Sequence, residues 1–274
     1  MSWWEELLRA FNYAFVIRAI IVGVAIAVSS SMIGAFLVLK KYSMVGHGLS
    51  HVAFAAVAIG LLLNQSPLIV TAFVVTLVSV FILQISERAK IHGDAAIGLT
   101  AAFSMALGTT LASVGGGFNV DLFSYLFGSI LTIQRIDVVL SVVLSIAVTI
   151  IVILFYNEFV SMTYDETFSR VSGIKTRRLN ILLAVLTGLT VVVGIRAIGT
   201  ILISALIIFP TITALQFSRG FKATILIAVV LSVLIVFMGL IGSFLLGLPS
   251  GSAIVLLNAI VFMFVFLYHT LIRR

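Results

Sequence analysis

Two histidines four residues apart, His47 and His51, are the residues of this sequence best suited to bind a metal ion. They stand at the start of the apolar segment "MVGHGLSHVAFAAVAIG", residues 44–60. Residues four apart lie on the same face of an α-helix, one turn above each other, so both imidazoles could contact a single ion. Imidazole is a ligand for zinc and for the later first-row metals. The spacing therefore predicts a metal contact.

Other roles are open to the same two histidines. They could close the cytoplasmic end of a membrane span by bonding to neighbouring carbonyls, or line a proton path. Ionisable residues within a span usually face the interior of the helix bundle and mark a pathway, which favours the metal contact. A zinc-protease site is excluded because Gly48 stands where the HExxH motif has its glutamate. His92 and His269 are interpreted as surface residues.

The composition places these histidines in a membrane protein. Hydrophobic residues make up 62% of the 274 residues, charged residues only 9%, and the mean hydropathy is +1.32. These values lie far outside the range of soluble domains. A membrane-spanning helix needs about 20 apolar residues, so about eight to ten spans would fill the chain. We expect residues 1–274 to form a single all-α transmembrane domain. The absence of cysteine excludes disulfides and thiolate metal sites.

Nine apolar runs are candidate spans of a bundle of eight to nine transmembrane helices. They cover residues 15–39, 45–63, 67–86, 95–114, 136–157, 178–195, 198–217, 222–246 and 252–270. Cytoplasmic loops are enriched in Lys and Arg. With the N-terminus outside and the C-terminus cytoplasmic, 12 of the 16 Lys and Arg residues fall inside: Lys40, Lys41, Arg88, Lys90, Arg170, Lys175, Arg177, Arg178, Arg219, Lys222, Arg273 and Arg274. The net charge of +7 is therefore interpreted as a topology signal, not as a nucleic-acid surface.

Two segments do not fit the pattern of simple spans. Residues 115–135 contain a Gly triplet and an apolar stretch too short to cross a bilayer, which predicts a partly inserted helix buried against protein. Residues 156–178 form the longest polar segment, and within it residues 163–173 are predicted to form a short cytoplasmic helix. Asp165 and Glu166 stand at its start, Phe168 and Val171 on one face, and Gly173 at its end. An ordinary solvated loop is the alternative interpretation.

Several motifs occur in a fixed order along the chain. They are Met44, Gly46, Leu49, Ser50 and His51 in the second span; "NVDL" at 119–122 and "YLFG" at 125–128; "DETFSRVSGI" at 165–174; "GTILISALIIFPTITA" at 199–214; and "LPSGSAIVL" at 248–256. Taken together, this order resembles the membrane-spanning permease subunit of bacterial ATP-binding-cassette importers for zinc, manganese and iron. The resemblance extends over nearly the whole chain.

The family's second span opens with a pattern close to Met-x-Gly-Asp-x-Leu-Ser-His. The resemblance implies that His51 contacts the metal, whereas His47 stands where the family usually has aspartate. An imidazole in place of a carboxylate softens the site and removes a negative charge, so we expect zinc to be favoured over manganese. Asn119 and Asp121 belong to another matched motif. Asp121 could accept an incoming cation or hold its loop by hydrogen bonds to the backbone, and the structural role is favoured beside glycines.

The resemblance also implies partners and a mode of action. Such permeases work as homodimers, dock a cytoplasmic ATPase inside and a metal-binding protein outside, and transport by alternating access. Residues 163–173 would then be the coupling helix, with Asp165, Glu166, Phe168 and Gly173 as its functional residues. The chain has no GxxxxGK[ST] loop and no nucleophile–base pair, so we expect it not to be an enzyme and to hold no permanent cofactor, only the metal in transit. An ion-gradient-driven secondary metal transporter is the alternative, although its usual intramembrane carboxylates are nearly absent here.

Overall fold

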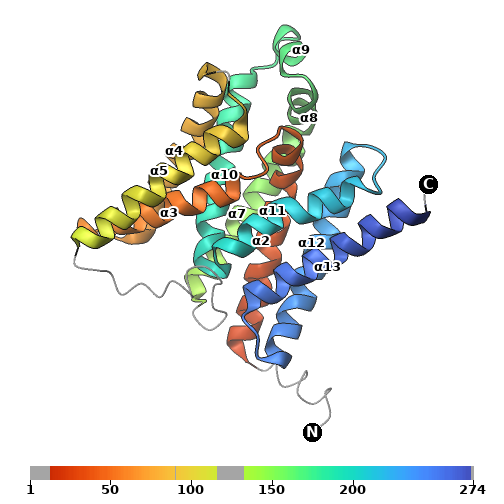
Figure 1. Ribbon diagram of the computed structural model, residues 1–274. Helices are drawn as coiled ribbons and strands as arrows, with labels where there is room; N and C mark the ends of the chain where they lie inside the picture. The colour runs from red at the N-terminus through yellow and green to blue at the C-terminus, as the bar shows by residue number, and fades with distance from the viewer. Residues whose placement is uncertain (1–12, 90, 116–132, 273–274) are drawn as a thin grey trace. The chain divides into compact units, whose positions relative to one another are not determined.

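The computed structural model describes residues 13–89, 91–115 and 133–272. Within those ranges all regular structure is α-helical (Figure 1). The helices are α2 (Ala14–Leu39), α3 (Val45–Leu62), α4 (Pro67–Ala89), α5 (Gly93–Val114), α7 (Arg135–Leu154), α8 (Tyr156–Tyr164), α9 (Glu166–Val171), α10 (Thr176–Ile198), α11 (Thr200–Leu215), α12 (Phe221–Leu246) and α13 (Ser250–Ile272).

The helices that are long and apolar enough to cross a membrane number eight in the described part of the chain. They are α2, α3, α4, α5, α7, α10, α12 and α13. The remaining predicted span, 198–217, corresponds to α11, which has only 16 residues. At a rise of about 1.5 Å per residue it extends over about 24 Å, less than the roughly 30 Å hydrocarbon core. The predicted all-α membrane bundle of eight to nine spans is confirmed.

The predicted short helix differs from the structure in its boundaries. Residue 163 was expected to begin it, but Thr163 and Tyr164 belong to α8, which follows α7 almost directly. The break falls at Asp165, whose backbone is extended (φ −148°, ψ 102°) and whose carboxylate accepts a hydrogen bond from the Phe168 N–H at 2.8 Å. Aspartate in this role ends one helix and starts the next, because its side chain satisfies a donor at the new N-terminus.

The chain divides into two compact units, which are described separately. Residues 1–35, 122–151 and 193–274 belong to the first unit, and residues 36–121 and 152–192 to the second. In the first unit α11, α12 and α13 pack on one another. Gly34 of α2 is close to α11, since a Cβ at this position would overlap the carbonyl oxygen of Ile207. Asp137 and Arg196 form an ion pair in the same unit.

The second unit contains the predicted functional residues. In this unit α3 packs closely on both α5 and α4. Helices α4 and α5 also lie side by side, as Figure 1 shows. Small residues allow the close approach of α3 and α5: a Cβ at Gly48 would overlap the Ile97 side chain, and one at Gly108 would contact Phe54. These contacts advance in the same direction along both helices, so α3 and α5 run parallel. The part of α10 in this unit lies against α4, where the Ser79 hydroxyl donates to the Ala184 carbonyl at 2.8 Å.

Candidate functional site

The two predicted metal-binding histidines lie together on the first two turns of α3. Their Nε2 atoms are 3.3 Å apart, and the ring planes are nearly perpendicular at 85°. Two nitrogens that bind one tetrahedral zinc at about 2.05 Å are separated by about 3.3 Å, so this spacing suits a shared ion. The geometry agrees with the distance that the i, i+4 spacing leads one to expect.

Packing of α3 leaves its histidine face open. Gly46, Gly48, Leu49 and Ser50 are buried, whereas His47 is exposed and His51 half-buried. Gly48 turns toward α5, and the Ser50 hydroxyl donates to the carbonyl of His47 at 2.6 Å, which ties down the first turn. The imidazoles therefore project from a rigid helix into space that this unit does not fill.

The described part of the chain brings together only two residues that could bind a metal ion. Among the residues that the structure describes, no group of three or more His, Cys, Asp and Glu side chains is placed to hold an ion. A tetrahedral site needs four ligands, and a transit site needs several. The pair can contact an ion but does not enclose it.

The second predicted functional segment is the short helix α9. Phe168 and Val171 have exposed fractions of 65% and 85%, although both are large apolar residues. Gly173 has φ +86° and follows the helix end, where its N–H donates to Arg170 O at 3.2 Å and the Ile174 N–H donates to Ser169 O at 3.0 Å. This is a Schellman ending, in which glycine adopts the left-handed conformation. The helix is thus closed at both ends and presents an apolar surface.

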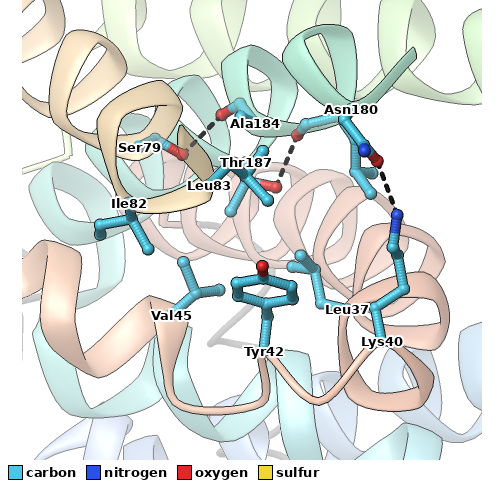
Figure 2. Close-up of a pocket in the computed structure, with 11 residues that line it drawn as sticks. Leu37, Lys40, Tyr42, Val45, Ser79, Ile82, Leu83, Asn180, Ala184 and Thr187 are labelled. Carbon is cyan, nitrogen blue, oxygen red and sulfur yellow. Dashed lines mark hydrogen bonds between the residues drawn. The ribbon is translucent and has the colours of Figure 1, made fainter. Parts of the chain in front are cut away.

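Glu166 points away from that apolar surface, toward two residues that the sequence did not single out. Its carboxylate lies 3.4 Å from Lys40 Nζ and accepts a hydrogen bond from Asn180 Nδ2 at 3.0 Å. Lys40 Nζ in turn donates to Asn180 Oδ1 at 2.6 Å, as Figure 2 shows. An asparagine just inside an apolar helix was the available signal, because a polar residue there needs a partner.

Another polar contact was also missed. Asp137 has a side chain only 5% exposed, and its carboxylate accepts hydrogen bonds from Arg196 Nε at 2.5 Å and from the Gln134 N–H at 2.8 Å. No local pattern in the sequence pairs Asp137 with Arg196, because the two residues are 59 positions apart. Asn119 and Asp121 lie outside the described residues, as does nearly all of the predicted partly inserted helix.

Eight apolar helices long enough to cross a bilayer, in the described part of the chain, define a polytopic membrane protein. The family model of the ABC 3 transport family matches residues 12–269, and the chain belongs to that family. The resemblance drawn from the motifs is confirmed.

Named relatives and a solved structure match the chain over most of its length. It is 31% identical over 260 residues to the "Manganese import system permease protein ScaB" of Streptococcus gordonii, covering 94% of this chain and 93% of the relative. It is 27% identical over 244 residues to the "High-affinity zinc uptake system membrane protein ZnuB" of Haemophilus influenzae, covering 89% and 94%. The structure of PsaBC from Streptococcus pneumoniae in complex with Fab matches with a TM-score of 0.83 at 27% identity, covering 96% of this chain and 95% of that chain.

Proposed function

We propose that this chain is the permease subunit of an ATP-binding-cassette importer that carries a divalent transition metal inward across the bacterial cytoplasmic membrane. The observation that carries the proposal is the His47–His51 pair, with two ring nitrogens 3.3 Å apart on the open face of an apolar helix. Membership of a transport family and the names of the manganese and zinc relatives support a metal as the cargo. The metal is substrate, not a resident cofactor.

Zinc is the favoured cargo. His47 presents imidazole, and nitrogen ligands suit zinc, whereas manganese prefers oxygen ligands. Relatives are named for both metals, so the distinction rests on this side chain.

The working unit is a homodimer with the pathway between two copies of the chain. A symmetric dimer presents the same surface twice. Two copies of the histidine pair would supply four imidazoles, which is the ligand number of tetrahedral zinc. Such a site must also release the ion, so we expect its affinity to be modest.

A separate cytoplasmic ATPase drives the cycle by docking on α9. The exposed side chains of Phe168 and Val171 are suited to enter an apolar cleft on that subunit. An extracytoplasmic metal-binding protein delivers the ion on the other side, and alternating access carries it inward. Asn119 and Asp121 would lie on the delivery side.

The proposed orientation has the N-terminus outside and the C-terminus inside, and it requires the short α11 to count as a crossing. The chain has no cysteine, so single cysteines can report the side of each loop. Gln65→Cys should react with a membrane-impermeant maleimide in intact cells, and Arg219→Cys only after permeabilisation. Five membrane-crossing helices, α4, α5, α7, α10 and α11, separate these positions if α11 crosses. Labelling of both positions from the same side would mean that α11 does not cross.

Metal uptake by the reconstituted complex tests the function itself. The permease, co-purified with its ATPase and supplied with the metal-binding protein, is placed in liposomes with zinc and manganese in competition. We expect uptake that requires ATP hydrolysis and persists when ionophores collapse all ion gradients. Uptake that follows an imposed ion gradient and ignores ATP would instead identify a secondary transporter.

A further inference from the structure

Three polar side chains from distant parts of the chain form a closed triangle, here called the Lys40 node: Lys40, Glu166 and Asn180. Lys40 Nζ donates to Asn180 Oδ1 at 2.6 Å and lies 3.4 Å from Glu166 Oε2. Asn180 Nδ2 donates to Glu166 Oε1 at 3.0 Å and closes the triangle. All three residues belong to the second unit.

The side chains of the node lie largely out of contact with solvent. The side chain of Lys40 is 9% exposed and that of Glu166 29%, and Asn180 is buried. A buried ammonium group is stable only when it is paired and hydrogen-bonded, so moving Glu166 away would leave the charge of Lys40 less well compensated. The second ion pair of Glu166, with Arg170, is different in kind because the Arg170 side chain is 68% exposed. Exposed ion pairs of this type contribute little to stability.

The node connects α9 to the helix that carries the histidines. Lys40 directly follows α2, and only seven positions separate it from His47. The turn between them is fixed: Lys41 has φ +62°, and the N–H groups of Lys41 and Tyr42 donate to Val38 O and Leu37 O at 3.1 and 2.9 Å. A left-handed lysine closed by two hydrogen bonds is a defined helix ending, not a flexible linker. This ending leads directly into the first turn of α3, where the Val45 N–H donates to the Tyr42 carbonyl at 3.2 Å.

Beside the node lies a small cavity of about 20 Å³. Its lining includes Lys40 and Asn180 together with Tyr42, Ser79 and Thr187, which Figure 2 shows around the same space. This volume is enough for one water molecule.

We propose that the Lys40 node is the linkage that transmits movement of α9 to α3 and thereby to the metal-contacting histidines. The inference rests on the proposed function, since it takes α9 as the contact for the ATPase. Lys40 acts as a positioning residue: it touches neither the metal nor the ATPase. Glu166 accordingly serves inside the permease and not at the docking surface.

The test compares ATP hydrolysis with metal uptake in the reconstituted complex. Lys40→Met keeps the length of the side chain but removes its charge, and Glu166→Gln keeps the shape of the carboxylate. We expect both variants to hydrolyse ATP at near the wild-type rate while zinc uptake per ATP falls at least tenfold. Lys222→Met is the matched control, because Lys222 is an exposed lysine at the start of α12. Zinc uptake per ATP in Lys222→Met should equal that of the wild type.

Exchanging the two charges of the node tests whether it transmits movement or only stabilises the fold. In the double variant Lys40→Glu/Glu166→Lys, Asn180 can serve both partners again if its amide rotates by half a turn, because it carries a donor and an acceptor. We expect the exchange to restore at least half of the uptake per ATP. This double variant also decides the matter if a single variant does not accumulate.

The possible outcomes distinguish the node from the function on which it rests. If wild-type complex shows no ATP-driven uptake, the proposed function is wrong. If wild-type uptake is normal and folded Lys40→Met and Glu166→Gln keep the wild-type ratio, or if the folded exchange variant fails to recover, the node is not the linkage.

Discussion

At the scale of single residues, two ion pairs join side chains from distant parts of the sequence. Asp137 and Arg196 are 59 residues apart, and Lys40 and Glu166 are 126 apart. The sequence could predict the histidine pair because four residues along one helix fix the geometry locally. It could not predict the ion pairs, because their partners are chosen by packing between helices.

The burial of Asp137 leads to a stability prediction. Arg196→Met leaves the Asp137 carboxylate in a nearly closed site without its cation, and removing one member of a buried pair costs about 3 kcal/mol. Arg170→Gln breaks an exposed pair and should change stability by less than about 0.5 kcal/mol. Denaturant unfolding of the purified permease in detergent measures both. Equal losses in the two variants would contradict the assigned burial.

At the scale of elements, the lengths of the apolar runs and the helix-capping residues were the main basis for the predicted helices. The apolar runs match the observed helices within a few residues, because the apolar length of a span is set by the bilayer. The short helix was misplaced at its start: residues 163 and 164 continue α8, and the break comes where Asp165 can cap α9. A residue such as Asp165 can either continue a helix or cap a new one, and the sequence alone does not determine which structure forms.

The exposed apolar surface of α9 leads to a prediction about coupling. Phe168 is 65% exposed on a six-residue helix, so its side chain has little of its own core to enter. Phe168→Ala should leave the permease folded but reduce zinc uptake per ATP hydrolysed at least tenfold, since the docking contact is lost. Phe217→Ala is the control, because Phe217 is also an exposed aromatic residue but lies after α11. Unchanged coupling in Phe168→Ala at normal expression would remove α9 from the docking role.

At the scale of the whole molecule, composition and motif order predicted the fold class and the family, and both are confirmed. These properties are spread over many residues, so single departures such as His47 do not obscure them. Partners, dimer symmetry and orientation remain proposals, because they depend on surfaces that meet other chains. In the proposed dimer, His47 and His51 of each copy would together form the metal site.

The central claim is that His47 and His51 contact the metal during ATP-driven import. The most direct measurement is competitive zinc and manganese uptake by reconstituted wild type, His51→Ala and His47→Asp, each normalised to folded permease. We expect His51→Ala to abolish uptake while the protein stays folded. His47→Asp should remain active and shift toward manganese, because a carboxylate favours the harder ion. Full activity of His47→Asp with an unchanged zinc-to-manganese ratio would contradict the ligand role of His47, and loss of folded protein in both variants would favour a structural role for the pair.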